Sequence, residues 1–206
     1  MKLYFSPGAC SLLPHILFRE AGIDFDSERV DLAAKRTASG RDYLAVNPKG
    51  CVPALEFDDG QILTETVAIA QYIADLKPET NLAPRPGTLE RYRLAEWLNF
   101  LSSEIHKSFS LYRRIAHLDG GRAYALGLLA KHFDFVQSYL RDRDYLVGGG
   151  FTVADAHLYM ELGWAKAGAD LGLGRWPALA DFEARIGARP AVARAVREVQ
   201  ALMNSN

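Results

Sequence analysis

The chain has 206 residues, 24 basic and 25 acidic side chains and a formal net charge of −1. Because 49% of the residues are hydrophobic, the chain can bury one large core or two small ones. This charge balance lacks the basic excess of nucleic-acid-binding proteins, and no apolar run approaches the roughly 20 residues of a membrane span. We therefore expect neither a nucleic-acid partner nor a membrane partner.

Cysteine and histidine usage sets expectations about compartment and metal. Cys10 and Cys51 are too few for a disulfide framework, and the N-terminus has no basic segment followed by a long apolar stretch. These features favour the reducing cytoplasm. The five histidines are scattered and show no zinc-type spacing with the cysteines, so we expect no metal.

The first part of the chain alternates strand and helix signals. Residues 1–5 predict a strand, and residues 11–21 predict a helix that ends at Gly22. Residues 28–32 predict a short strand at the edge of the sheet. The β-α-β order predicts that these two strands run parallel.

A hairpin and a second helix follow. Residues 54–57 and 61–64 flank an Asp-Gly turn, which is the sequence signature of a β-hairpin. Apolar residues recur at helical spacing over residues 65–76. Three prolines and one glycine in residues 77–87 forbid a continuous helix there and predict a linker.

From Thr88 onwards the pattern is nearly all helical. Thr152 and Asp155 have the spacing of a capping box, with Asp in place of the usual Glu. We predict an α/β domain over residues 1–80, a linker over residues 81–87 and an all-helical domain over residues 88–206. A cleft between two such domains is the natural ligand site.

Cys10 is the most informative residue, because it lies where the first strand turns into the first helix. A thiol at a helix N-terminus meets unpaired N–H groups and the positive end of the helix dipole, and both stabilise the reactive thiolate. Reactive cysteines in such places have pKa values of about 3.5–7.5, against about 8.5 for a free thiol. On this segment alone, the alternative of a small buried side chain stays open.

Val52-Pro53 comes directly before the strand predicted at residues 54–57. A β-α-β unit with an N-terminal cysteine, followed by a proline that opens the next strand, resembles the thioredoxin-like arrangement. There a cis proline faces the cysteine, and the residue before the proline offers its backbone to an extended peptide.

Two sets of polar residues can be explained by ordinary structural roles when only their neighbouring sequence is considered. Glu65 and Thr66 begin a helix and fit both ends of an amino acid, but ordinary capping is the more common role. Asn99, Ser103 and His106 form a polar stripe on one helix face, and a solvated face is the default for such stripes.

Four segments in this order resemble the cytosolic glutathione transferases over essentially the whole chain: Ser6–Ser11, Asn47–Leu55, Leu63–Ile69 and Phe151–Ala156. Cysteine at the catalytic turn resembles the bacterial beta class. The resemblance implies a thioredoxin-like N-terminal domain followed by a C-terminal helical domain. It also implies glutathione as co-substrate and a homodimer.

The resemblance further implies roles for single residues. Cys10 approaches the glutathione sulfur and forms a mixed disulfide there, and His106 is the second catalytic residue. Val52 pairs its backbone with the cysteinyl part of glutathione, beside a cis Pro53. The remaining implied glutathione ligands are Ala9, Lys35 at the glycyl end, Glu65 and Thr66 at the γ-glutamyl end, and Asn99, Ser103, Glu104, Ile105, His106 and Lys107 of the same or the partner subunit.

Two positions depart from the family pattern. Cys51 stands where glutamine is usual, either as a simple loop replacement, which we favour, or as a thiol that resolves the mixed disulfide. His157 stands where an aromatic residue is common, so the second-substrate pocket, to which Trp164 is also assigned, is expected to be more polar.

The function implied is detoxifying conjugation of glutathione to small hydrophobic electrophiles, with thiol-disulfide exchange through Cys10. Two alternatives stay open: a non-catalytic protein that binds glutathione and hydrophobic ligands, and a dedicated glutathione-dependent dehalogenase or ether-cleaving enzyme.

Overall fold

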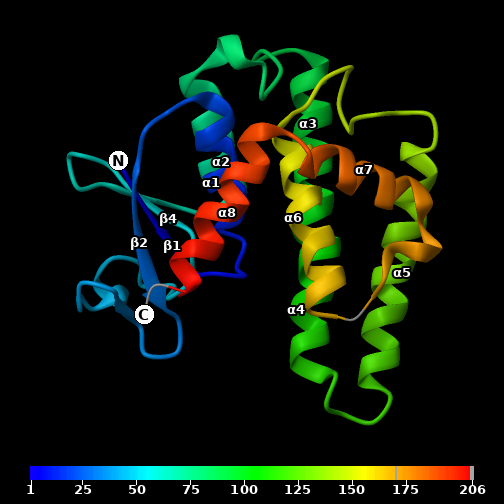
Figure 1. Cartoon of the computed structure of the whole chain (residues 1–206), viewed down its shortest axis with the longest axis horizontal. Helices are drawn as coiled ribbons and strands as arrows, with labels where there is room; N and C mark the ends of the chain where they lie inside the picture. Colours follow the sequence, from blue (N-terminus) through cyan, green and yellow to red (C-terminus); the bar gives the residue numbers. More distant parts are fainter. Residues whose placement is uncertain (170, 205–206) are drawn as a thin grey trace. The chain divides into compact units, whose positions relative to one another are not determined.

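The computed structural model describes residues 1–169 and 171–204 (Figure 1). The chain forms two compact units, one of Met1–Leu82 with the segment from Arg189 onwards and one of Ala83–Ala188. The last helix, α8 (Pro190–Asn204), packs against α1 (Leu12–Ala21), so by contact it belongs with the N-terminal unit rather than with the helical one. The domain boundary expected at residues 81–87 stays a prediction.

The N-terminal unit is built on a five-stranded sheet with the order β3-β2-β1-β4-β5. Strands β1 and β2 are parallel as predicted, and β4 and β5 form the predicted antiparallel hairpin. The strands are β1 (Lys2–Phe5), β2 (Asp26–Asp31), β3 (Arg36–Thr37), β4 (Ala54–Glu56) and β5 (Ile62–Thr64).

The expectation of β2 at the sheet edge is wrong, because β3 pairs with it on the outside. The carboxylate of Asp31 accepts the N–H groups of Ala33 at 2.8 Å and Ala34 at 2.9 Å. These contacts turn the chain back at the end of β2, so that Arg36 and Thr37 run antiparallel beside it.

Two further features of this unit confirm the sequence predictions. Helix α1 ends at Gly22, whose φ of 63° lies in the left-handed region where glycine has no steric penalty. Helix α2 (Thr66–Leu76) follows the hairpin and packs against α1. Tyr4 of β1 and Phe18 of α1 are fully buried and belong to the core.

A cluster of charged and polar groups joins α8 to α1. Glu198 of α8 accepts hydrogen bonds at 2.8 Å from His15 Nε2, Arg19 Nε and Arg194 Nε. His15 is buried and paired, as predicted for a packing residue rather than a ligand. Burial by itself raises the pKa of Glu198, but these three donors outweigh it and lower the pKa to about 2.

Glu198→Gln is expected to lower the free energy of unfolding at neutral pH by about 1–2 kcal/mol, because three charge-assisted hydrogen bonds become weaker neutral ones at a partly exposed site. The ionised carboxylate stabilises the fold above its ordinary pKa of 4.5, and that stabilisation is lost as the pH falls towards about 2. Urea unfolding at several pH values tests this. The exposed control Glu79→Gln should change little, and equal acid sensitivity of Glu198→Gln and the unchanged chain would contradict the assignment.

The second unit is helical, as predicted. Its main helices are α3 (Leu89–Phe100), α4 (His106–Ile115), α5 (Gly121–Leu140), α6 (Val153–Ala167) and α7 (Pro177–Gly187). Thr88 caps α3, since its hydroxyl accepts the N–H of Arg91. The sequence did not predict the π-helical turn over Leu101–Ile105, which joins α3 to α4.

The predicted capping box at the start of α6 is present. The carboxylate of Asp155, which is fully buried, accepts the N–H and the hydroxyl of Thr152 at 2.8 and 2.9 Å. It also accepts the N–H of Leu146 at 2.8 Å, which fixes the preceding loop to the helix. The box is therefore a structural element of this unit.

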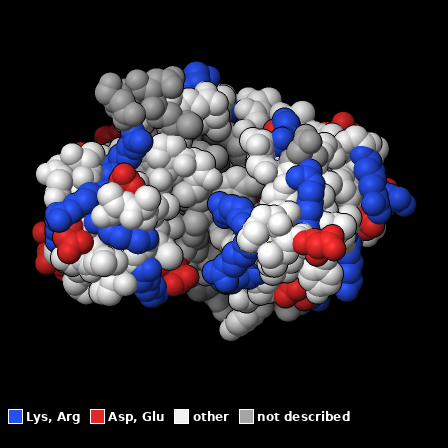
Figure 2. Space-filling view, turned by 90° about the horizontal axis from the view of Figure 1, so that it is seen from below, with Lys and Arg blue, Asp and Glu red and all other residues white. Residues whose placement is uncertain are grey.

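Acidic and basic side chains are interspersed on the face shown in Figure 2, in line with the near-zero net charge. Among the described residues, no helix is both long enough and apolar enough to span a membrane.

Candidate functional site

Cys10 lies in a turn that its neighbours hold in place. The hydroxyl of Ser11 donates to Ser6 O at 3.1 Å and accepts the N–H of Ser6 at 3.2 Å. The N–H of Ala9 donates to the same carbonyl at 3.1 Å, and α1 begins directly after Ser11. The partly buried Cys10 therefore stands just before the first turn of α1, where the sequence places it.

The Cys10 thiol donates a hydrogen bond to the backbone carbonyl of Val52 at 3.2 Å. The Val52-Pro53 peptide bond is cis, as the resemblance implies. Because a carbonyl oxygen only accepts, the thiol is the donor in this contact. The neighbouring carbonyl of Cys51 accepts from Tyr43 Oη at 2.8 Å, and this bond anchors the segment that presents Val52.

Glu65 occupies an unusual backbone conformation at the start of α2. Its φ of 73° with a ψ of 121° is sparsely populated by residues other than glycine, and such conformations cluster at functional sites. Its side chain is 70% exposed, and its carboxylate pairs with Lys49 Nζ at 2.5 Å. Lys49 also donates to the hydroxyl of Thr64 at 3.0 Å.

Sequence reasoning missed Lys49 as a partner of this site. Its only signal is its place in the segment Asn47–Leu55, and nothing in that segment indicates that its side chain reaches Glu65. Thr66 opens α2 beside Glu65, as predicted.

Lys35 also reaches the segment before Val52. Its ammonium group donates to the carbonyl of Gly50 at 2.8 Å. Gly50 has a φ of 63°, and a Cβ atom there would lie 3.3 Å from Lys35 Nζ, so glycine permits this approach. Within the N-terminal unit, the side chains of Cys10 and Lys35 thus both contact the backbone of residues 49–53. Lys49, at the start of this segment, contacts Glu65.

The remaining predicted ligands lie in the helical unit. Asn99 and Ser103 are exposed, as expected for a solvated stripe, and each is paired locally: Asn99 Nδ2 donates to Ala95 O, and Ser103 Oγ donates to Glu104. The side chain of Ile105 is fully buried, so only its backbone can face a ligand. Lys107 is exposed.

His106 differs from the rest of that stripe because it is mostly buried. Its ring packs edge-on against Trp164 with 5.0 Å between the ring centroids. Burial is the main cause that lowers the pKa of His106 to about 4, and the proximity of His157, Lys107 and Arg113 lowers it further. The imidazole is therefore neutral at neutral pH.

His157, expected in the second-substrate pocket, is buried in α6 and only 1% exposed. Its Nε2 lies 3.2 Å from Oε1 of Glu161, one helical turn away, and His106 Nδ1 lies 3.7 Å from the same oxygen. Sequence reasoning missed Glu161, although an acid four residues after His157 on a buried helix face was the available signal.

The N-terminal unit is thioredoxin-like, with a cysteine before its first helix and a cis proline at the start of a later strand. A helical unit follows it. This is the architecture of the glutathione transferases. Family models described as "Glutathione S-transferase, N-terminal domain" and "Glutathione S-transferase, C-terminal domain" match residues 8–76 and 102–190. The chain belongs to the glutathione S-transferase family, and the predicted fold and enzyme class are confirmed.

Similar proteins include bacterial enzymes that match almost the whole chain. The chain is 44% identical to glutathione S-transferase GstA of Escherichia coli O157:H7, over 93% of this chain and 95% of that protein. A sphingomonad glutathione S-transferase, solved in complex with glutathione, is 45% identical with a TM-score of 0.93, covering 97% and 99% of the two chains. A beta-class enzyme of Sphingomonas chungbukensis is 45% identical with a TM-score of 0.91, covering 97% and 98%. The predicted resemblance to the beta class is thereby confirmed.

Proposed function

We propose that this chain conjugates glutathione to small hydrophobic electrophiles and exchanges thiols with glutathione-containing disulfides through Cys10. The observation that carries the proposal is the 3.2 Å contact of Cys10 Sγ with the carbonyl of Val52, beside the cis Pro53. This geometry sets the thiol against the backbone group that would pair with the cysteinyl residue of an extended peptide. A relative solved with glutathione bound supports this ligand.

The groups expected to hold glutathione already contact other residues of the chain. Glutathione would displace those internal partners when it binds. Its ammonium would replace Lys49 on Glu65, with the adjacent carboxylate at the N-terminus of α2 near Thr66. Its cysteinyl N–H would replace the Cys10 thiol on the Val52 carbonyl. Its glycyl carboxylate would draw Lys35 away from Gly50, and Ala9 lines the same turn.

The exchange step follows from ordinary disulfide chemistry. The Cys10 thiolate attacks the glutathione sulfur of a mixed disulfide, a Cys10–glutathione bond forms, and the other thiol leaves as a thiolate that takes up a proton. A second glutathione thiolate then releases oxidised glutathione and restores Cys10. In conjugation, by contrast, the sulfur of glutathione itself attacks the electrophile, so the transfer step needs no metal.

The helical unit would supply the rest of the pocket. In the role that the family resemblance implies, the neutral imidazole of His106 would accept or donate a proton at the reacting sulfur, and Trp164 would offer an apolar surface to the electrophile. His157 is only 1% exposed, so it would not itself present a polar surface to the electrophile. The implied contacts to glutathione from the same or the partner subunit are Asn99, Ser103, Glu104, Ile105, His106 and Lys107.

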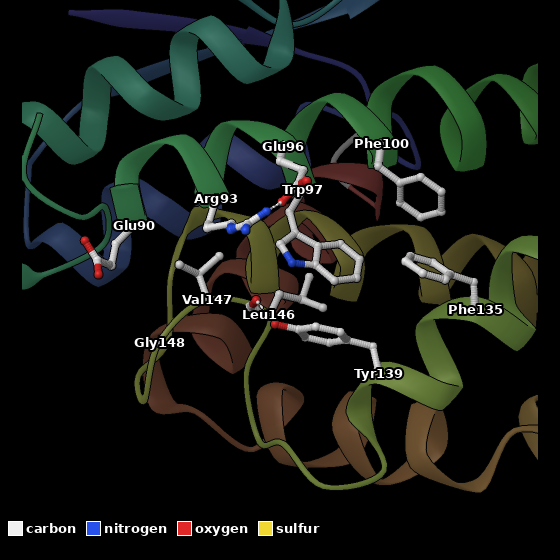
Figure 3. A pocket seen from close by; sticks show the side chains of 10 residues that line it. All are labelled: Glu90, Arg93, Glu96, Trp97, Phe100, Phe135, Tyr139, Leu146, Val147 and Gly148. Atoms are coloured by element: carbon white, nitrogen blue, oxygen red, sulfur yellow. Dashed lines mark hydrogen bonds and ion pairs between the residues drawn. The ribbon is translucent and has the colours of Figure 1, made fainter. Parts of the chain in front are cut away.

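We further propose a cytoplasmic homodimer. An aromatic groove of about 530 Å³ in the helical unit supports a second copy as partner (Figure 3). Trp97, Phe100, Phe135 and Tyr139 line it, and the half-exposed Phe135 offers apolar surface. Trp97 is only 7% exposed, so it is mainly a core residue, as predicted.

Glu65→Ala is expected to weaken glutathione binding about 10- to 150-fold, because a hydrogen bond to a charged group contributes about 1.5–3 kcal/mol. Lys49→Met should bind at least as tightly as the unchanged chain, since it removes the competing internal cation. Isothermal titration calorimetry measures both, with Glu79→Ala as a distant acidic control. Weaker binding by Lys49→Met would contradict the partner exchange, and no saturable binding by the unchanged chain at millimolar glutathione would remove the function.

Turnover assays separate the open alternatives. A steady-state panel of aromatic electrophiles, halogenated alkanes, aryl ethers and glutathionylated disulfides should show conjugation and exchange. Binding without turnover on any member of the panel favours the ligand-binding alternative. Turnover confined to halogenated alkanes or to ethers favours the dedicated enzyme.

A further inference from the structure

Helix α6 carries a buried carboxylate that accepts no hydrogen bond from the described residues. Glu161 is fully buried, and neither of its oxygens makes a hydrogen bond with any described residue. His157 lies one turn earlier on the same helix, is 1% exposed, and has both ring nitrogens without a hydrogen bond among the described residues. Its Nε2 lies 3.2 Å from Glu161 Oε1, but the approach does not have hydrogen-bond geometry.

A buried carboxylate that has neither a hydrogen bond nor a Lys or Arg partner is costly, and proteins meet that cost with a proton, a paired cation or a metal ion. The cationic side chains near this cluster, Lys107 and Arg113, lie close enough to act on His106. Neither of them makes a described ion pair with Glu161. The groups that do approach the carboxylate are two imidazoles, His157 at 3.2 Å and His106 at 3.7 Å.

We propose that His106, His157 and Glu161 form a binding site for one divalent transition-metal ion of the zinc type. The inference goes beyond the proposed glutathione chemistry and does not depend on it. It also replaces the expectation of no metal, which rested on sequence spacing. His106 lies on a different helix from the other two ligands, and spacing along the chain does not reveal such a pair.

The geometry fits one ion. One ligand atom from each residue lies within 4.8 Å of the others. Ligands at about 2.0–2.2 Å from zinc lie at most about 4.4 Å apart across the ion. The two separations from Glu161 Oε1, 3.2 and 3.7 Å, are inside that limit, and rotation of the two imidazoles, whose ligand atoms lie within 4.8 Å of each other, would close the third.

The donor set selects the class of ion. Imidazole with a carboxylate suits zinc, cobalt, nickel and iron, whereas calcium and magnesium prefer oxygen ligands alone. Three protein ligands leave one tetrahedral position open. His106 is the partly exposed member, with 22% of its side chain accessible, so the ion would enter and keep its open position on that side.

The test is binding of Zn²⁺ and Co²⁺ to metal-stripped protein in a Cys10→Ser, Cys51→Ser background, which removes the competing thiol ligands. Calorimetry should show one Zn²⁺ per chain, and Co²⁺ should give visible absorption bands that Zn²⁺ abolishes. Glu161→Gln and His157→Phe should each weaken binding by more than the roughly 10- to 100-fold that loss of an outer-sphere partner costs. The exposed His117→Ala is the matched histidine control and should bind like its parent.

A third variant guards against misfolding. His106→Ala changes a partly exposed position, should keep the circular dichroism spectrum of its parent, and should lose Zn²⁺ to the same degree. The proposal is overturned by absence of saturable Zn²⁺ binding at 100-fold excess over protein. Equal binding by Glu161→Gln, His157→Phe, His106→Ala and the parent would also overturn it, because the ion would then sit elsewhere.

Discussion

Cys10→Ala is expected to abolish exchange with glutathionylated disulfides, reducing the rate to that of the uncatalysed reaction. Exchange needs a protein sulfur that takes glutathione and passes it on, and the structure sets the Cys10 thiol against Val52 at the cis peptide bond. Intact mass after exposure to oxidised glutathione should show one adduct on the unchanged chain and none on the variant. Conjugation should survive in measurable part, because glutathione brings its own sulfur.

Cys51→Ser is the matched control, since Cys51 is the only other cysteine of the sequence. Cys51 is exposed, and its thiol lies 3.4 Å from the carbonyl of Lys49. We expect the Cys10 adduct to form and decay at unchanged rates in this variant. A slower decay would give Cys51 the resolving role, and undiminished exchange by Cys10→Ala would remove Cys10 from the mechanism.

Asp155→Ala is expected to lower the free energy of unfolding by about 3–5 kcal/mol. The change deletes a fully buried carboxylate and leaves the N–H groups of Leu146 and Thr152 without their acceptor. Each buried, unsatisfied N–H costs about 1–3 kcal/mol, and loss of the helix cap adds about 0.5–2 kcal/mol. Urea unfolding followed by circular dichroism measures the loss.

Two variants calibrate that measurement. Asp181→Ala on the exposed face of α7 should change the free energy of unfolding by less than about 0.5 kcal/mol. Asp155→Asn keeps one acceptor oxygen, so its loss of unfolding free energy should lie between those of Asp181→Ala and Asp155→Ala. A loss below about 1 kcal/mol in Asp155→Ala would mean that the capping box contributes little to this fold.

The features that the sequence predicted depend on local backbone preferences, whereas those that it missed depend on contacts between segments. Gly22 and the Asp-Gly turn act locally, through backbone preferences that any short window reveals. The pairing of β3 with β2 depends on the side chain of Asp31 turning the chain, and two residues are too few for a periodic signal. The missed partners, Lys49 on Glu65 and Glu161 beside His106, require distances between segments that spacing does not encode.

The π-helical turn over Leu101–Ile105 sets the direction in which the helix after it presents its side chains. Such a turn holds one residue more than an α-helical turn, because its hydrogen bonds join residues five apart rather than four. Removing one of the two serines, Ser102 or Ser103, would restore an uninterrupted α-helix and rotate everything after it by about 100°. His106 would then leave the side of the helix that meets Glu161. A variant that lacks one of these serines should therefore keep the helical architecture and lose the approach of His106 to Glu161.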